Sequence, residues 1–124
     1  ATPVASLGLV GDPVPSRPQA VEDALALGLV PVVTPLACGP LNVNADEAAA
    51  ALAVGIEAER IVFLTDVPGL LLGGIVTPVI SAAEAERMLD ASDFEGGIVP
   101  KLRAAITAAR LGVRAESGET AVLA

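Results

Sequence analysis

The sequence predicts an α/β domain with a mostly parallel sheet, and three observations support this fold class. Short apolar runs typical of strands alternate along the chain with longer helical runs, which is the order of βαβ units. Capping residues and glycines bound the helical runs. The chain has 124 residues, the size of one domain, and no internal repeat or second-domain boundary divides it.

The strands and helices are expected from local patterns of hydrophobicity. The runs expected to form strands are 6–10, 29–34, 60–65, 75–80, 113–115 and 120–124. The run 29–34 is predicted to be buried, and 60–65 is the clearest buried strand. The runs expected to form helices are 16–27, 44–54, 81–90 and 100–111.

Capping signals place the helix ends. Three pairs have the spacing of a capping box, in which the first side chain binds a backbone amide of the first turn: Ser16 with Gln19, Asn44 with Glu47, and Ser81 with Glu84. Gly28 and Gly112 follow the ends of two helices, and Pro100 falls in the first turn of the last one.

The composition argues against several classes of function. The net charge is −8 and the pI is about 4.3, whereas a protein that binds nucleic-acid phosphates normally carries a basic surface. The chain has no histidine and one cysteine, Cys38, which argues against a zinc site and removes Ser-His and Cys-His nucleophiles. Any chemistry must therefore use carboxylates, lysine, arginine, hydroxyls or backbone amides.

The hydropathy pattern argues against membrane insertion. Hydrophobic residues make up 53% of the chain and the mean hydropathy is +0.69, but much of this is alanine. No apolar run approaches the roughly 18–20 residues that span a bilayer. The start of the chain lacks a basic segment followed by a cleavage pattern, and the single cysteine suits a reducing compartment. A cytoplasmic location is therefore expected.

Asn42 and Asp46 form the first candidate site. Asp46 falls in the first turn of the helix expected from residue 44, where the helix dipole favours an ionised carboxylate. Asn42 lies just before the cap, so both side chains can face the same loop. The alternative is that these residues only begin the helix, as asparagine and aspartate commonly do.

Lys101 is the second candidate. It follows Gly96, Gly97 and Pro100 at the start of a helix, where a cation opposes the dipole at a cost of about 0.3–1 kcal/mol. Free backbone amides, glycines and a lysine together form a phosphate site. The alternative is a solvated surface lysine. The spacing is not that of a P-loop.

The third candidate is the segment 65–71, TDVPGLL, which follows the strand expected at 60–65. Ligands of open α/β sheets bind beyond the carboxyl ends of parallel strands. Asp66 could therefore bind a ribose hydroxyl or an amide. The alternative is a tight turn that needs only Pro68 and Gly69.

Taken in this order, the candidate segments resemble the amino acid kinase family. The segments that carry the resemblance are 8–12 (GLVGD), 30–35 (VPVVTP), 41–49 (LNVNADEAA), 63–71 (FLTDVPGLL) and 96–101 (GGIVPK). The resemblance covers nearly the whole chain, and the Asn-x-Asn-Ala-Asp motif points to the branch that phosphorylates N-acetyl-L-glutamate. It implies a three-layer αβα sandwich.

The resemblance also implies a role for each candidate residue. Asn42 would contact the acetylated amino acid, Asp46 would orient the catalytic lysines, and Lys101 would bind the ATP phosphates. The implied nucleotide-binding residues are Asp66, Val67, Pro68, Gly69, Leu70, Leu71, Gly97 and Lys101. ATP with Mg²⁺ would phosphorylate the side-chain carboxylate of N-acetyl-L-glutamate in arginine biosynthesis, and the resemblance assigns no protein residue as a metal ligand.

The resemblance also sets expectations for the assembly. Family members carry an N-terminal half that this chain lacks, which supplies another catalytic lysine and most of the substrate pocket. Residues 1–124 are therefore expected to form a single nucleotide-binding domain that is inactive or very weak alone. A homo-oligomer is expected, and a PII-type regulator is left open. The alternatives are an acetylaminoadipate-type kinase of lysine biosynthesis and a nucleotide-binding module without turnover.

Overall fold

The computed structural model describes residues 1–65, 70–72, 75–77, 79–91 and 97–118. Its elements, in chain order, are β1 (Thr2–Pro3), the 3₁₀ helix η1 (Ala5–Leu7), β2 (Gly11–Asp12), α1 (Gln19–Ala26), β3 (Leu36–Ala37), β4 (Leu41–Asn42), α2 (Ala45–Gly55), β5 (Arg60–Leu64), β6 (Leu70–Leu72), β7 (Ile75–Thr77), α3 (Ala82–Asp90), α4 (Ile98–Arg110) and β8 (Arg114–Gly118). None of the helices among these residues has the length and apolar character needed to cross a membrane.

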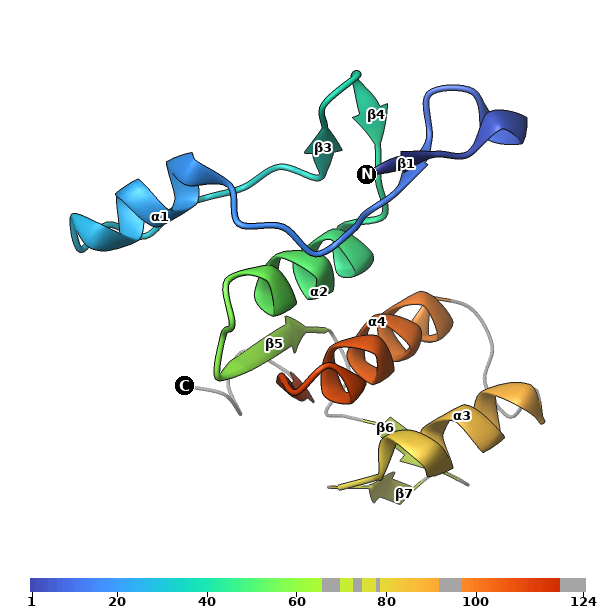
Figure 1. Cartoon of the computed structure of the whole chain (residues 1–124). Helices are drawn as coiled ribbons and strands as arrows, with labels where there is room; N and C mark the ends of the chain where they lie inside the picture. Colours follow the sequence, from blue (N-terminus) through green and yellow to red (C-terminus); the bar gives the residue numbers. More distant parts are fainter. Residues whose placement is uncertain (66–69, 73–74, 78, 92–96, 119–124) are drawn as a thin grey trace.

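The helices α2 and α4 lie at the centre of the molecule (Figure 1). An N-terminal region made of α1 and β1 to β4 runs along one side of α2. On the other side of α2, α4 packs against it and against the parallel pair β5–β8, and α3 packs on α4. The strands β6 and β7 form an antiparallel hairpin near α3.

The pair β5–β8 is the sheet that organises the core. Its strands run parallel in continuous register from Arg60 opposite Arg114 to Leu64 opposite Gly118. The pairs β1–β2, β3–β4 and β6–β7 are antiparallel. The connection from β5 to β8 contains α4, as a parallel pair needs a long crossover. Helix α2 precedes β5 and packs with α4 against the face of the pair that buries Ile61 and Phe63.

The core lies between that face and the two helices. Its buried residues come from α2, β5, α4 and the segment before β8: Ala50, Ala53, Ile61, Phe63, Ala104, Ala108 and Val113. The expected strand 60–65 is therefore confirmed as β5, although only one of its faces is buried, as its alternating pattern shows. Most of the helical contribution is alanine, which lets α2 and α4 approach each other closely.

The helix positions predicted from capping signals are largely confirmed. The Asn44 Oδ1 atom accepts hydrogen bonds from the backbone amides of Asp46 at 3.0 Å and Glu47 at 3.2 Å, which begins α2. Ser81 Oγ accepts from the Glu84 amide at 3.2 Å, which begins α3. Gly112 follows the end of α4 with a φ of +91°, a conformation that glycine adopts without strain.

The predicted start of α1 is wrong. The helix begins at Gln19 with Pro18 as its N-cap and without a side-chain cap, so Ser16 does not form the predicted capping box. The physical reason is that a proline disfavours the helical conformation of the residue before it. Arg17 precedes Pro18, so the helix cannot extend back to Ser16.

Two predicted strands are absent from the described structure. In the run 6–10, Ala5–Leu7 form a 3₁₀ helix and Gly8 has a φ of +68°, which a regular strand cannot contain. The Val4 amide donates to the Val10 carbonyl at 2.9 Å, in the antiparallel register of β1 and β2, so residues 5–9 form the loop that joins these two strands.

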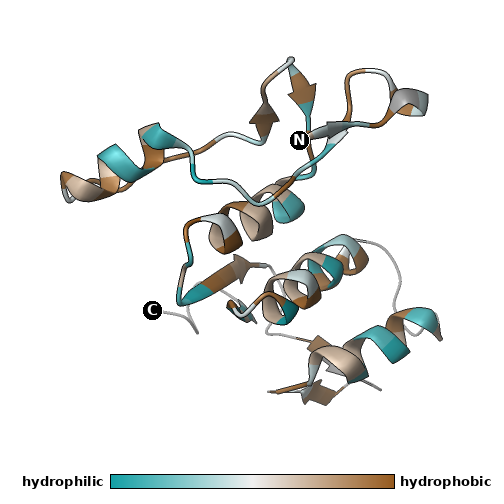
Figure 2. Ribbon diagram, viewed as in Figure 1, coloured by the Kyte–Doolittle hydropathy of each residue, from teal (hydrophilic) through white to brown (hydrophobic). Residues whose placement is uncertain are grey.

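The run 29–34 was predicted to be a buried strand, and that prediction is also wrong. Val30 is 89% exposed and Val32 is 94% exposed, and this apolar segment joins α1 to β3 in Figure 2. The amides of Val30, Val32 and Val33 donate to no backbone carbonyl of a described residue. A strand needs a partner, and the described part of the chain places none beside this segment. The run 120–124 lies outside the described residues.

Candidate functional site

Asp46 is positioned by the start of α2. It is the second residue of the helix, immediately after the Asn44 cap and Ala45. The cap holds the Asp46 amide, which fixes the backbone from which the carboxylate projects. The Asp46 side chain is 25% exposed, so the carboxylate is largely but not fully covered.

Lys101 comes from the start of α4. Gly97 is the N-cap and offers no side chain to the first amides, and the first turn contains no acidic residue. This helix start carries the positive end of the α4 dipole. Lys101, one turn into the helix, adds a full positive charge at the same place.

The structure brings Lys101 and Asp46 into direct contact. The distance between Lys101 Nζ and Asp46 Oδ1 is 2.7 Å, and the lysine side chain is 20% exposed. The two residues are 55 positions apart in the sequence. They meet because α2 and α4 pack closely through buried alanines, with Ala50 on α2 and Ala104 on α4 among them.

Phe63 completes this arrangement, and the sequence did not single it out. Its ring centroid lies 5.3 Å from Lys101 Nζ, within the range of a cation–π contact. Phe63 is 4% exposed and belongs to the buried face of β5. The pattern of β5 predicts its burial, but nothing in the local sequence links it to a lysine on a distant helix.

The other predicted site residues form no described side-chain contact with the Lys101–Asp46 pair. Asn42 lies in β4 and is exposed, and its backbone amide donates to the Leu9 carbonyl at 2.7 Å. No hydrogen bond joins the Asn42 side chain to another residue that the structure describes. Gly97, expected in the loop before a helix at 100–111, is the N-cap of α4, which begins at Ile98, and its predicted nucleotide contact stays a prediction.

The nucleotide-binding segment predicted at 66–71 is only partly visible. Leu70 and Leu71 belong to β6, which pairs with β7. Asp66, Val67, Pro68 and Gly69 lie outside the described residues, so their predicted contacts stay predictions.

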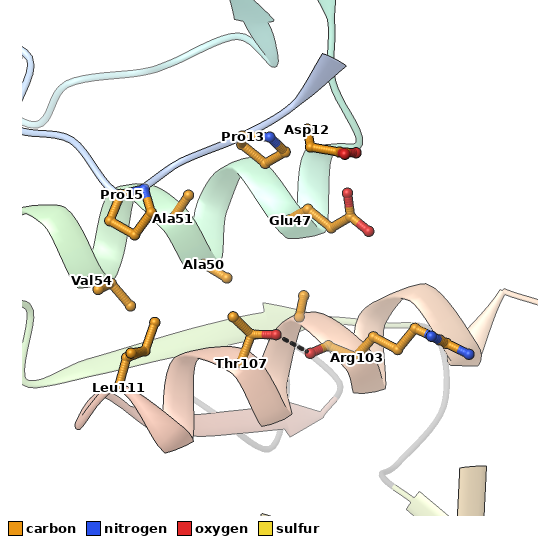
Figure 3. Close-up of a pocket in the computed structure, with 11 residues that line it drawn as sticks. Asp12, Pro13, Pro15, Glu47, Ala50, Ala51, Val54, Arg103, Thr107 and Leu111 are labelled. Atoms are coloured by element: carbon orange, nitrogen blue, oxygen red, sulfur yellow. Dashed lines mark hydrogen bonds between the residues drawn. The ribbon is translucent and has the colours of Figure 1, made fainter. Parts of the chain in front are cut away.

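A cavity of about 280 Å³ lies between α2, α4 and the proline-rich loop that follows β2 (Figure 3). Its charged side chains Asp12, Glu47 and Arg103 gather at one end, and Val54 and Leu111 lie at the other. Neither Asp46 nor Lys101 lines it. The cavity is therefore separate from the candidate phosphate site.

The arrangement is suited to binding an anion. A lysine ammonium has three N–H donors, and Asp46 Oδ1 accepts one hydrogen bond from it. The positive end of the α4 dipole favours an anion at the same helix start. Among the described residues, no group of three His, Cys, Asp or Glu side chains could hold a metal ion.

We expect Asp46→Asn to destabilise the protein more than Glu47→Gln does. Both changes remove a carboxylate from the first turn of α2, so they lose a similar interaction with the helix dipole. Only Asp46 pairs with a lysine, while Glu47 forms no ion pair with a described residue. The difference should be about 1–2 kcal/mol in the free energy of unfolding, measured by urea titration, because the pair is partly exposed. Equal losses would show that the pair contributes nothing to stability.

Comparison with known sequences shows to which family of proteins the chain belongs. The model of the amino acid kinase family matches residues 2–115. The chain therefore belongs to the amino acid kinase family.

Within this family, the chain is similar to curated proteins named acetylglutamate kinase. The chain is 43% identical over 116 residues to an acetylglutamate kinase of Roseiflexus castenholzii, covering 91% of this chain and 45% of the relative. It is 48% identical over 116 residues to an acetylglutamate kinase of Rubrobacter xylanophilus, covering 91% of this chain and 46% of the relative. The chain thus spans a little under half the length of these relatives.

Solved structures confirm the α/β fold class. The structure of smu.665 from Streptococcus mutans UA159 is similar with a TM-score of 0.84 and 27% identity, over 93% of this chain and 49% of that one. A structure from Aeropyrum pernix K1 is similar with a TM-score of 0.62 and 29% identity, over 91% of this chain and 34% of that one.

Proposed function

We propose that residues 1–124 form a single nucleotide-binding domain of an acetylglutamate kinase, with Lys101 as the main contact to the ATP phosphates. The observation that carries this proposal is the Lys101–Asp46 pair, 2.7 Å apart at the adjoining starts of α4 and α2. The curated relatives named acetylglutamate kinase support the choice of reaction.

In the proposed reaction, a side-chain carboxylate oxygen of N-acetyl-L-glutamate attacks the γ-phosphorus of ATP. A new O–P bond forms, the bond between the γ-phosphorus and the β,γ-bridging oxygen breaks, and ADP leaves with that electron pair. The product is an acyl phosphate, as arginine biosynthesis requires. Phosphoryl transfer needs positioning and charge neutralisation more than covalent help from the protein, so the absence of histidine is no obstacle.

Lys101 and Asp46 have distinct roles in this proposal. Lys101 neutralises the charge that spreads over the phosphate oxygens during transfer. Asp46 holds the ammonium in place through its 2.7 Å contact and does not itself touch the phosphates. Asn42 would contact the acetylated amino acid, and the segment 66–71 with Gly97 would contact the nucleotide.

Magnesium fits this proposal as an ion that arrives with ATP. Mg²⁺ keeps several waters and is commonly held by phosphates with one or two carboxylates. The described residues offer no dedicated acidic cluster, and Asp46 already pairs with Lys101. When bound, the ion would neutralise phosphate charge, while Lys101 supplies the protein's own share.

Nucleotide titration of the chain tests the proposal. By calorimetry, we expect ADP to bind more tightly than adenosine, because only ADP carries phosphates for Lys101. A second measurement, on the complete enzyme, traps the acyl phosphate with hydroxylamine, using N-acetyl-L-glutamate and N-acetyl-2-aminoadipate as acceptors. More hydroxamate from the aminoadipate would favour the kinase of lysine biosynthesis. Equal affinities for ADP and adenosine would contradict a phosphate site in this chain.

A further inference from the structure

Two unlike contacts hold the ammonium group of Lys101. One is the carboxylate of Asp46 at 2.7 Å, and the other is the ring of Phe63, with its centroid at 5.3 Å. The carboxylate is 25% exposed and sits at a helix start, whereas Phe63 is 4% exposed. The ring is therefore the more firmly fixed of the two.

The fold explains why the ring is fixed. Phe63 is the fourth residue of β5, where it lies opposite Ser117 of β8 in the parallel register. Its side chain belongs to the core cluster between the sheet, α2 and α4. The ring cannot move without opening that core, so the position of the ring beside the Lys101 ammonium stays fixed.

The chemistry of the two contacts differs in a way that matters for an anion. Asp46 accepts a hydrogen bond and opposes the lysine charge, whereas an aromatic face attracts a cation without neutralising it. The ring therefore holds the ammonium without compensating its charge, and the N–H groups that Asp46 does not use remain for a further acceptor. The lysine side chain is 20% exposed, so it is not sealed inside the core.

We propose that Phe63 is a positioning residue for phosphate binding by Lys101. The ring holds the ammonium in the same place in the free and the nucleotide-bound protein, so less side-chain freedom is lost on binding. This inference rests on the proposed function, because it takes Lys101 as the phosphate ligand. A purely structural Phe63 would fill the core and leave nucleotide affinity unchanged.

Fluorination of the Phe63 ring tests the inference without changing the fold. 4-Fluoro- and 3,4,5-trifluorophenylalanine nearly keep the ring's shape but weaken the negative face that attracts the cation. We expect ADP affinity to fall stepwise, by about 3–10-fold at the trifluoro ring. Adenosine affinity should stay constant, since adenosine has no phosphate. In a Lys101→Met background, the same fluorinations should not change ADP affinity.

Ile61→Val is the matched control. Ile61 lies on the same buried face of β5, and the change perturbs the core without touching the ring that faces Lys101. It should lower the free energy of unfolding and leave ADP affinity unchanged. An ADP affinity that does not respond to ring fluorination, or an equal loss for ADP and adenosine, would overturn the role of Phe63. If Lys101→Met itself leaves ADP affinity unchanged, the proposed phosphate site fails, and the role of Phe63 fails with it.

Discussion

Lys101→Met should lower the affinity of the chain for ADP by about 10–100-fold and leave its affinity for adenosine unchanged. Methionine keeps the length and apolar stem of lysine but has no charge or N–H donor. The loss corresponds to one or more hydrogen bonds between a charged donor and a phosphate. Calorimetry with ADP and adenosine measures both affinities in the same preparation.

Arg103→Met is the matched control for this prediction. Arg103 lies two residues further along α4, is exposed, and forms no ion pair with a described residue. Both variants lose one positive charge from the same helix, so any general electrostatic attraction of ADP falls in both. If Arg103→Met weakened ADP binding as much as Lys101→Met, the attraction would come from net charge and not from a defined contact.

Ala108→Leu should lower the free energy of unfolding by about 2–3 kcal/mol, because it overpacks the core. Ala108 is 0% exposed, and it belongs to the core cluster with the alanines of α2 and α4. A larger side chain must push α4 away from its neighbours. Since α4 carries Lys101, the same variant should also weaken ADP binding. Urea unfolding and ADP titration measure the two effects.

Ala109→Leu provides the comparison for that variant. Ala109 is the next residue of α4 and is exposed, and leucine and alanine have similar helix propensities. We expect its free energy of unfolding to stay within about 0.5 kcal/mol of the parent, as for most surface changes. An equal loss in both variants would mean that close packing of α4 does not limit stability.

The helix ends could be predicted because each depends on a few neighbouring residues. Asn44 needs only the amides of its own first turn, and Gly112 needs only a permissive φ, so the local sequence contains the whole cause. The start of α1 was mispredicted because Pro18 overrides the Ser16 signal. That effect is equally local and could have been predicted.

The strands were harder to predict because a strand depends on a partner far away in sequence. The runs 29–34 and 60–65 are both rich in β-branched and apolar residues, although Pro31 interrupts the first, and only the second finds a partner, β8, among the described residues. Val30 and Val32 therefore stay exposed despite a pattern typical of a buried strand. Local hydrophobicity cannot distinguish these two outcomes.

In the candidate site, too, the local sequence predicted the helix starts but not the contacts between distant residues. Helix-start chemistry predicted that the dipole favours Asp46 and opposes Lys101. Each had an ordinary alternative, and only the order of motifs in a family suggested that they belong together. The 2.7 Å contact between them depends on how α2 packs on α4. Phe63 was missed because its role depends on a contact with a residue 38 positions later in the chain, across the core.

The position of the phosphates in a crystal structure of the chain with ADP is the most direct test of the proposed site. We predict a phosphate oxygen within about 2.7–2.9 Å of Lys101 Nζ, the distance of a charge-assisted hydrogen bond. Asp46 and the Phe63 ring should keep their contacts with the same ammonium. Phosphates bound elsewhere, with the Lys101–Asp46 pair undisturbed, would contradict it.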